Sequence, residues 1–253
     1  MIRVVFNQKG GVGKSSIATN LAAIGASRGI NTLLVDLDPQ CNSTQYLLGE
    51  DVTVVEQTVR DLFTYRGKVA VESFGFITQS PFENLDLIAA DANISDIQTK
   101  LESKHKIFKL REILQALESV YDVIIIDTPP AYNFFTLSAL IAAERCLIPF
   151  DCDDFSRRAL YTLLENLAET QEDHNENLEL DGIVVNQFQA RARLPNDIIN
   201  ELIDEDMPVL DSRISHSVKM RESHSESVPL IYLAPSHKLT QEFVALYDEI
   251  NEQ

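Results

Sequence analysis

The segment KGGVGKS at residues 9–15 holds three glycines and two lysines in seven positions. Glycines allow a loop whose backbone N–H groups point toward one centre, where they can bind the oxygens of a phosphate. The ammonium of Lys14 can reach the β- and γ-phosphates of a nucleotide, and the hydroxyl of Ser15 can hold Mg²⁺. This spacing therefore predicts a site for a nucleotide and its magnesium ion.

Acidic residues follow two apolar runs. Asp36 and Asp38 end the run TLLVDLD, and Asp127 follows the run VIII. Side chains alternate in direction along a strand, so Asp36 and Asp38 are expected to point the same way, toward the metal and an attacking water. An aspartate at the end of a buried strand can bind Mg²⁺ through water, which is the role expected for Asp127.

The elements that must position these residues alternate between short apolar runs and stretches with helical periodicity. The expected strands are residues 1–6, 32–37, 85–89, 122–126, 146–150, 182–185 and 230–233. The expected helices include residues 14–28, 107–117, 155–170 and 238–250. This alternation predicts an α/β fold, with a mostly parallel twisted sheet flanked by helices on both faces, in a single domain over residues 1–253. Ligands of such sheets bind at the carboxyl ends of the strands, where each motif lies.

Composition excludes several classes of protein. The 253 residues are 45% hydrophobic, which is typical of a globular chain. The three cysteines have no CxxC spacing, so a zinc site or a disulfide framework is not expected. We found neither a signal peptide nor an apolar stretch of about 20 residues, and we expect a soluble cytoplasmic protein. The net charge of −18 argues against a general nucleic-acid binder, although a local basic face remains compatible with it.

The three motifs, in this order, resemble the signature segments of the ParA/MinD superfamily of P-loop ATPases, and of its ParA branch in particular. The matching segments are NQKGGVGKS at 7–15, LVDLDPQ at 34–40 and DTPP at 127–130. Gln8 stands where an ordinary phosphate loop has glycine, and a second lysine, Lys9, follows it. Weaker similarity continues through residues 182–186 and 213–229. The resemblance implies the P-loop NTPase fold with ATP and Mg²⁺ as cofactors.

The resemblance also implies roles for individual residues. Lys9 is similar to the lysine that reaches across a nucleotide-sandwiched dimer, and Asp38 is similar to the aspartate that orients the attacking water. Asn186 resembles an asparagine that contacts adenine. The implied catalytic residues are Lys9, Lys14 and Asp38, and the implied metal residues are Ser15, Asp38 and Asp127. The implied nucleotide-binding residues are Lys9, Gly10, Gly11, Val12, Gly13, Lys14, Ser15, Ser16 and Asn186.

A ParA-like protein is expected to form a homodimer with ATP, bind DNA non-specifically at the nucleoid and position DNA or another large cargo. A ParB-like or other adaptor protein would stimulate its slow hydrolysis. The segment 213–229 resembles the DNA-facing part of ParA proteins. The residues expected to contact DNA are Arg191, Arg193, Arg213, Lys219 and Arg221.

Two other functions remain compatible with the fold. A MinD-like regulator that cycles on a membrane would need a basic amphipathic anchor, whereas the last expected helix carries Glu242, Asp248 and Glu249. A ligase similar to dethiobiotin synthetase would lack the second lysine of the loop. The five histidines are expected at the surface, and the cargo is left open between plasmid, chromosome, protein array and microcompartment.

Overall fold

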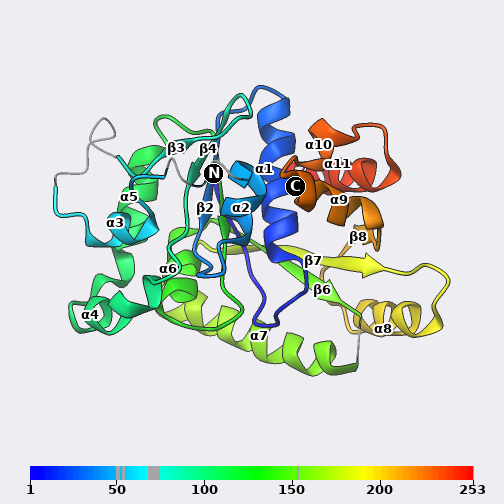
Figure 1. Ribbon diagram of the computed structural model, residues 1–253. Coiled ribbons are helices and arrows are strands. Elements are labelled where there is room, and N and C mark those ends of the chain that lie inside the picture. Colours follow the sequence, from blue (N-terminus) through cyan, green and yellow to red (C-terminus); the bar gives the residue numbers. More distant parts are fainter. Residues whose placement is uncertain (50–51, 53–54, 68–74, 153, 253) are drawn as a thin grey trace.

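The computed structural model describes residues 1–49, 52, 55–67, 75–152 and 154–252. Within them, one eight-stranded sheet has the order β3-β4-β2-β5-β1-β6-β7-β8 (Figure 1). The strands are β1 (Ile2–Val5), β2 (Thr32–Asp36), β3 (Thr78–Gln79), β4 (Leu85–Ile88), β5 (Val123–Asp127), β6 (Arg145–Asp151), β7 (Glu179–Phe188) and β8 (Val209–Ser215). Every pairing is parallel except the antiparallel pair β3–β4, so the predicted, mostly parallel sheet is confirmed.

Helices cover both faces of the sheet (Figure 1). The α-helices are α1 (Lys14–Ser27), α2 (Asn42–Leu48), α3 (Val59–Thr64), α4 (Gln98–Ser103), α5 (Lys109–Leu117), α6 (Phe134–Ala142), α7 (Asp154–Asp173), α8 (Arg193–Asp204), α9 (Val218–Glu226), α10 (Leu230–Leu233) and α11 (Lys238–Asn251). The 3₁₀ helices whose bounds lie within the described residues include η3 (Ile94–Ile97) and η4 (Lys106–Phe108). One core cluster packs α1, α2, α10 and α11 on one face, and a second packs α3, α5, α6, α7 and α8 on the other.

The segment 230–233 was predicted to be a strand, and that prediction is wrong. It forms the short helix α10, which starts after Pro229. The Leu230 N–H donates to the Asn20 side-chain oxygen of α1 over 2.9 Å, so this backbone group bonds to a helix rather than to a strand. A short apolar run is compatible with both a strand and a helix. In this segment the contacts with the rest of the fold favour the helix.

The last helix, α11, uses its apolar side for the core. Its buried residues include Leu239, Phe243, Leu246 and Ile250. No helix within the described ranges has the length and apolar character needed to cross a membrane. Because the apolar side of α11 already packs against the sheet and α1, a membrane has no free apolar face on this helix to bind.

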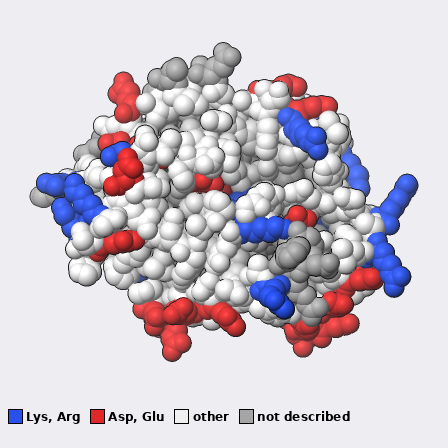
Figure 2. All heavy atoms as spheres, turned by 60° about the horizontal axis from the view of Figure 1, so that its bottom comes forward, with Lys and Arg blue, Asp and Glu red and all other residues white. Residues whose placement is uncertain are grey.

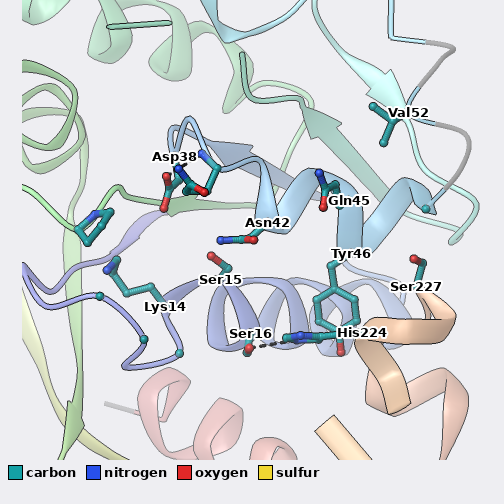
Figure 3. A pocket seen from close by; sticks show the side chains of 16 residues that line it. Lys14, Ser15, Ser16, Asp38, Asn42, Gln45, Tyr46, Val52, His224 and Ser227 are labelled. Carbon is teal, nitrogen blue, oxygen red and sulfur yellow. Dashed lines mark hydrogen bonds between the residues drawn. The ribbon is translucent and has the colours of Figure 1, made fainter. Parts of the chain in front are cut away.

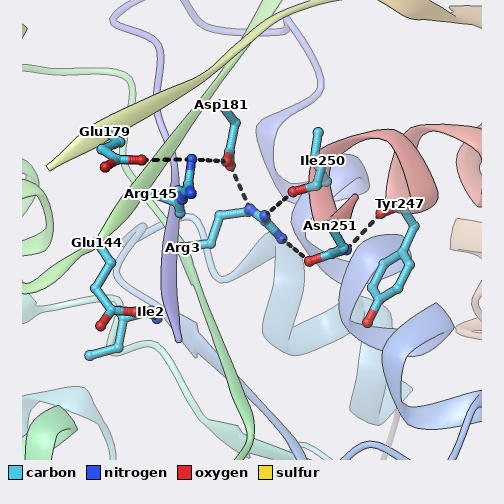
Figure 4. A network of polar contacts seen from close by, with 9 residues as sticks. All are labelled: Ile2, Arg3, Glu144, Arg145, Glu179, Asp181, Tyr247, Ile250 and Asn251. Atoms are coloured by element: carbon cyan, nitrogen blue, oxygen red, sulfur yellow. Dashed lines mark hydrogen bonds and ion pairs between the residues drawn. The ribbon is translucent and has the colours of Figure 1, made fainter. Parts of the chain in front are cut away.

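A buried ion-pair network ties the amino end of β1 to α11 and β7 (Figure 4). Arg3 is 1% exposed, and its Nε lies 2.6 Å from Oδ2 of Asp181. The Arg3 guanidinium also donates to the Ile250 carbonyl at 2.9 Å and to Asn251 at 3.2 Å. Burial raises the pKa of Asp181, and the charge of Arg3 opposes that rise. Arg3 therefore holds α11 in place through its hydrogen bonds to Ile250 and Asn251. The buried charge of Arg3 is itself stabilised by the carboxylate of Asp181.

Arg3→Met is expected to lower the free energy of unfolding by about 3–5 kcal/mol, because it leaves a buried carboxylate without its main partner. Urea unfolding measures the loss. Arg3→Met/Asp181→Leu removes both charges and is expected to recover much of it. Arg28→Met is a control that removes the exposed pair with Asp248, with an expected loss of about 0–1 kcal/mol. A double variant as unstable as Arg3→Met would contradict this account.

Candidate nucleotide site

The phosphate loop lies between β1 and α1 and is held by hydrogen bonds on several sides. The Lys9 N–H donates to Oδ1 of Asn7 at 2.8 Å. The side-chain amides of Asn186 and Gln187, at the end of β7, donate to the carbonyls of Val12 and Gly11 at 2.8 and 2.9 Å. Helix α1 begins directly after Gly13, so its N-terminal N–H groups and dipole point into the loop. The loop is therefore a preformed anion cradle.

Gly13 cannot be replaced without strain at this loop. Its φ is +89°, and a Cβ there would lie 2.1 Å from Nδ2 of Asn186. Gly13→Ala is therefore expected to weaken ATP binding on the order of tenfold to a hundredfold, measured by calorimetry with a non-hydrolysable analogue.

The matched control for Gly13→Ala is Gly29→Ala. Gly29 has a similar φ of +81°, but nothing lies within 4 Å of the added Cβ. This control is expected to cost stability and leave ATP affinity unchanged. Gly13→Ala/Asn186→Ala removes the clash and is expected to regain part of the affinity. Equal ATP binding by Gly13→Ala and wild type would show that the loop tolerates a side chain.

A cavity of about 840 Å³ opens beside the loop, at the carboxyl ends of β1, β2 and β5 (Figure 3). In the strand register, Asp127 is the neighbour of both Val5 and Asp36, so the three strands end together. The cavity is lined by Gly10, Gly11, Gly13, Lys14, Ser15, Ser16, Asp38, Gln40, Asn42, Gln45, Tyr46, Gly49, Val52, Pro130, His224 and Ser227.

Lys14 is 6% exposed and its Nζ donates to the Lys9 carbonyl at 3.1 Å. Burial lowers the pKa of Lys14, and the charges of Asp127 and Asp38 oppose that shift. Figure 3 shows the ammonium beside the loop, below Asp38. A polyanionic phosphate bound in the cavity would stabilise this buried ammonium by pairing its charge.

Asp38 is held by its own turn. Its N–H donates to Oδ1 of Asp36 at 3.0 Å, and its Oδ1 accepts from the Gln40 N–H at 2.9 Å. The carboxylate is 5% exposed and lines the cavity across from Lys14 and Ser15 (Figure 3). Because the Gln40 N–H holds one of its oxygens, the Asp38 carboxylate faces the cavity in a defined orientation.

Asp127 fits an outer role toward magnesium. It is fully buried, and its Oδ2 accepts from the Ser43 hydroxyl at 2.7 Å. Its Oδ1 is buried with no hydrogen-bond partner among the described residues. Burial raises the pKa of Asp127, while the nearby hydroxyls of Ser15 and Ser43 and the charge of Lys14 oppose that rise. A water bound to a cation held at Ser15 would satisfy the orphaned oxygen.

The donor set suits Mg²⁺ better than a metal that needs a protein cage. Hydroxyl and carboxylate oxygens are hard ligands, and Mg²⁺ usually takes few protein ligands and completes its shell with water and phosphate. Among the described residues, no cluster of three or more His, Cys, Asp or Glu side chains could hold a metal by itself. The residues therefore fit magnesium that arrives with a nucleotide.

The expectation that Asp36 faces the site together with Asp38 is wrong. Asp36 is fully buried and does not line the cavity. Its Oδ2 accepts from the N–H and the hydroxyl of Thr44 at 2.9 and 2.8 Å, so it anchors α2. Burial and the charge of Asp127 raise the pKa of Asp36. Strand β2 ends at Asp36 and the chain turns there, so the alternation of a strand does not extend to Asp38.

Two residues expected at the nucleotide lie at the edge of this site. Nζ of Lys9 lies 3.8 Å from Asp151, and Lys9 does not line the large cavity. Asn186 lines a second cavity of about 200 Å³, which also contacts Gly11 and Gly13 of the loop. Gln187, Ser215 and Arg221 are among its other lining residues. The position of Asn186 beside the loop is compatible with a base contact, but here its amide binds Val12.

The basic residues expected at DNA are partly engaged within the chain. The Arg213 guanidinium lies 5.1 Å from the ring centre of Phe188, and Lys219 is ion-paired with Glu222. Arg193 pairs with Asp197 at 3.2 Å. Arg191 and Arg221 are exposed. Figure 2 shows basic and acidic side chains interleaved on the face it presents, rather than one continuous basic surface.

A cluster between α1, α2 and α9 lines the cavity, and Ser16 is its one member that was expected at the nucleotide. The Ser16 hydroxyl lies 3.1 Å from Nε2 of His224 (Figure 3). The ring centres of Tyr46 and His224 lie 4.3 Å apart, and the Tyr46 hydroxyl lies 2.5 Å from the hydroxyl of Ser223. These residues connect the phosphate loop to α9. They lie far apart in the sequence, so only the fold brings them together.

The comparison with known proteins agrees with this geometry. The family described as an AAA domain matches residues 1–180. The sporulation initiation inhibitor protein Soj of Bacillus subtilis is 32% identical over 251 residues, which are 98% of this chain and 97% of Soj. The chromosome-partitioning ATPase Soj of Treponema pallidum is 33% identical, over 90% of this chain and 87% of that protein.

Solved structures share the fold over nearly the whole chain. Apo McdA from Cyanothece aligns with a TM-score of 0.86 and 22% identity, over 98% of both chains. Cobyrinic acid a,c-diamide synthase from Mycobacterium smegmatis with bound ATP analog and magnesium aligns with a TM-score of 0.84 and 24% identity, over 98% of this chain and 92% of that one. The chain belongs to the AAA-domain family and, within it, to the ParA/Soj type of P-loop ATPase.

Proposed function

We propose that this protein is an ATP-driven dimerisation switch that positions or segregates DNA or another large cargo. The observation that carries the proposal is the meeting of Lys14, Ser15, Asp38 and Asp127 in and beneath one cavity at the phosphate loop. The Soj relatives support the cellular role, since one of them is named a chromosome-partitioning ATPase. We propose that residues 1–253 act as a single ATPase domain.

The proposed reaction is transfer of the γ-phosphoryl group of ATP to water. This reaction requires positioning and charge neutralisation more than covalent chemistry by the protein. Lys14 and the loop N–H groups hold the phosphates, and Ser15 holds Mg²⁺ with Asp38 and Asp127 nearby. Asp38 aligns the attacking water, and Lys9 of a second copy contributes the remaining positive charge. Mg²⁺ supplies further neutralisation of the phosphate oxygens.

The output of the switch is a change in partners. ATP joins two copies face to face, the dimer binds DNA at the nucleoid, and a ParB-like or other adaptor protein stimulates hydrolysis. The acidic α11, with its buried apolar side, favours this cycle over a MinD-like cycle on a membrane.

The test of this function is ATP-dependent binding of random duplex DNA. We expect a gel shift with ATP whose affinity falls with salt by a log–log slope of roughly −0.9 per phosphate contact. Lys219→Glu/Arg221→Glu is expected to abolish the shift and leave ATP binding intact, because it reverses two charges on α9.

The matched control is Lys104→Glu/Lys106→Glu, which changes the net charge by the same amount on a distant surface. It is expected to retain the shift. If neither wild type nor the Asp38→Ala variant shifts DNA with ATP at low salt, the nucleoid is not the carrier, and the DNA part of the proposal fails.

A further inference from the structure

Residues 98–111 form the most basic surface segment of an acidic chain. They contain five Lys or Arg and one acidic residue, whereas the whole chain has 21 basic and 39 acidic residues. Lys100, Lys104 and Lys106 are exposed, and none of them forms an ion pair with another described residue. Figure 2 shows basic side chains gathered at the left edge, on the side where Figure 1 places α4. Lys109 of the same segment is buried and lies 3.8 Å from Glu112, so the three exposed lysines carry the positive charge that no described carboxylate pairs.

An apolar cavity of about 580 Å³ opens beside this segment, between α4, η4 and the start of α6. Phe108 and Tyr132 line it, and each is 37% exposed. The other lining residues are Gln98, Glu102, His105, Ile107, Asn133, Phe134 and Leu137. Aromatic side chains exposed around a concave apolar surface are typical of a protein interface.

Contacts within the chain hold the walls of the cavity in place. Asn133 caps α6 by accepting from the N–H groups of Phe135 and Thr136, each at 3.1 Å. The Tyr132 hydroxyl lies 2.8 Å from that of Thr170 on α7. On the other wall, the Arg111 guanidinium lies 4.8 Å from the ring centre of Phe108. A preformed pocket of this kind costs little ordering entropy when it binds a side chain.

The pocket is separate from the nucleotide cavity but lies close to it along the chain. The two cavities share no lining residue among those described. Pro130 lines the nucleotide cavity, and Tyr132, two residues later, lines the apolar one. The nucleotide site therefore does not explain the exposed aromatic residues.

We propose that this basic-rimmed pocket docks an acidic segment of a partner protein, which inserts an aromatic or aliphatic side chain. The lysines of the rim attract acidic residues that flank the inserted side chain. The one carboxylate of the lining, Glu102, accepts a hydrogen bond from Gln98 at 2.8 Å and is outnumbered by the lysines around it. Proteins bind duplex DNA mainly through positive charge placed along its phosphate backbone, and an apolar pocket adds nothing to such contacts. The pocket therefore favours a peptide.

The experiment is selection of a random short-peptide library on the wild-type chain, followed by fluorescence anisotropy with the enriched peptides. We expect enriched peptides to combine Asp or Glu with Phe, Leu or Ile. Phe108→Ala and Lys104→Glu/Lys106→Glu are each expected to weaken binding about tenfold. Matched controls elsewhere on the surface, Ile203→Ala and Lys238→Glu, are expected to leave affinity unchanged.

The proposal is overturned if no peptide is enriched, if the enriched peptides lack acidic residues, or if Phe108→Ala binds them as tightly as wild type. Loss of random-duplex DNA binding in Lys104→Glu/Lys106→Glu would also overturn it and assign the surface to nucleic acid. Thermal melting shows that each variant is folded. Because the assay needs no nucleotide and should give the same affinity with Lys14→Ala, its failure is distinguishable from failure of the proposed ATP switch.

Discussion

Replacing Lys14 with alanine is expected to reduce ATP turnover on the order of a hundredfold to a thousandfold, because the cavity loses the cation that faces the transferring phosphoryl group. Lys14 is 6% exposed, and burial lowers its pKa although the charges of Asp127 and Asp38 oppose that shift, so an anionic ligand would further stabilise the charged ammonium. Removing it should therefore leave the folded chain intact. Phosphate release under saturating ATP and Mg²⁺ measures turnover, and calorimetry with a non-hydrolysable analogue measures affinity.

The matched control is Lys109→Ala. Lys109 is also buried, at 7% exposure, but its ammonium lies near Glu112 and the ring of Tyr65, away from the cavity. This variant is expected to keep wild-type turnover per folded molecule even if it melts at a lower temperature. Wild-type turnover and affinity in Lys14→Ala would remove the basis for assigning ATP to this loop.

Most of the fold was predictable because buried parallel strands are continuous apolar runs. The strands β1, β2, β4, β5, β6 and β7 all lie where such runs occur. Strand β8 was not predicted because it lies at the edge of the sheet and includes the polar residues 211–213. The two-residue strand β3 is too short to give a pattern. An apolar run in the sequence indicates a buried strand. Edge strands are less buried than central strands, so they give a weaker pattern.

The parts of the site that come from one continuous motif were predictable from the sequence. The parts that distant segments contribute through tertiary packing were not. The loop and Asp38 line one cavity as expected, because each follows directly from the end of a strand. Tyr46 and His224 complete the cavity from helices that only tertiary packing brings together. Asn186 was expected from resemblance to contact adenine, yet its amide braces the loop in this structure. Local spacing carries no information about such long-range contacts.

Asp38→Ala is expected to leave ATP bound and to slow hydrolysis on the order of a hundredfold or more, because the attacking water loses the carboxylate that aligns it. The carboxylate is oriented by the Gln40 N–H and faces Lys14 and Ser15 across the cavity. Because hydrolysis is the proposed step that separates the two copies, the ATP-bound dimer should accumulate. Light scattering with ATP and Mg²⁺ measures its mass, and ADP is the control nucleotide.

Lys9 then tests how the two copies are joined. In the single chain its ammonium lies 3.8 Å from Asp151, so it must leave that carboxylate to reach a second copy. Lys9→Ala/Asp38→Ala is therefore expected to return the trapped dimer to a monomer, whereas Lys219→Ala/Asp38→Ala, which removes a surface lysine, should remain dimeric. Asp151→Asn/Asp38→Ala weakens the competing contact and is expected to dimerise at lower protein concentration than Asp38→Ala. A monomeric Asp38→Ala with saturating ATP, or a dimer that survives the loss of Lys9, would rule out this mode of assembly.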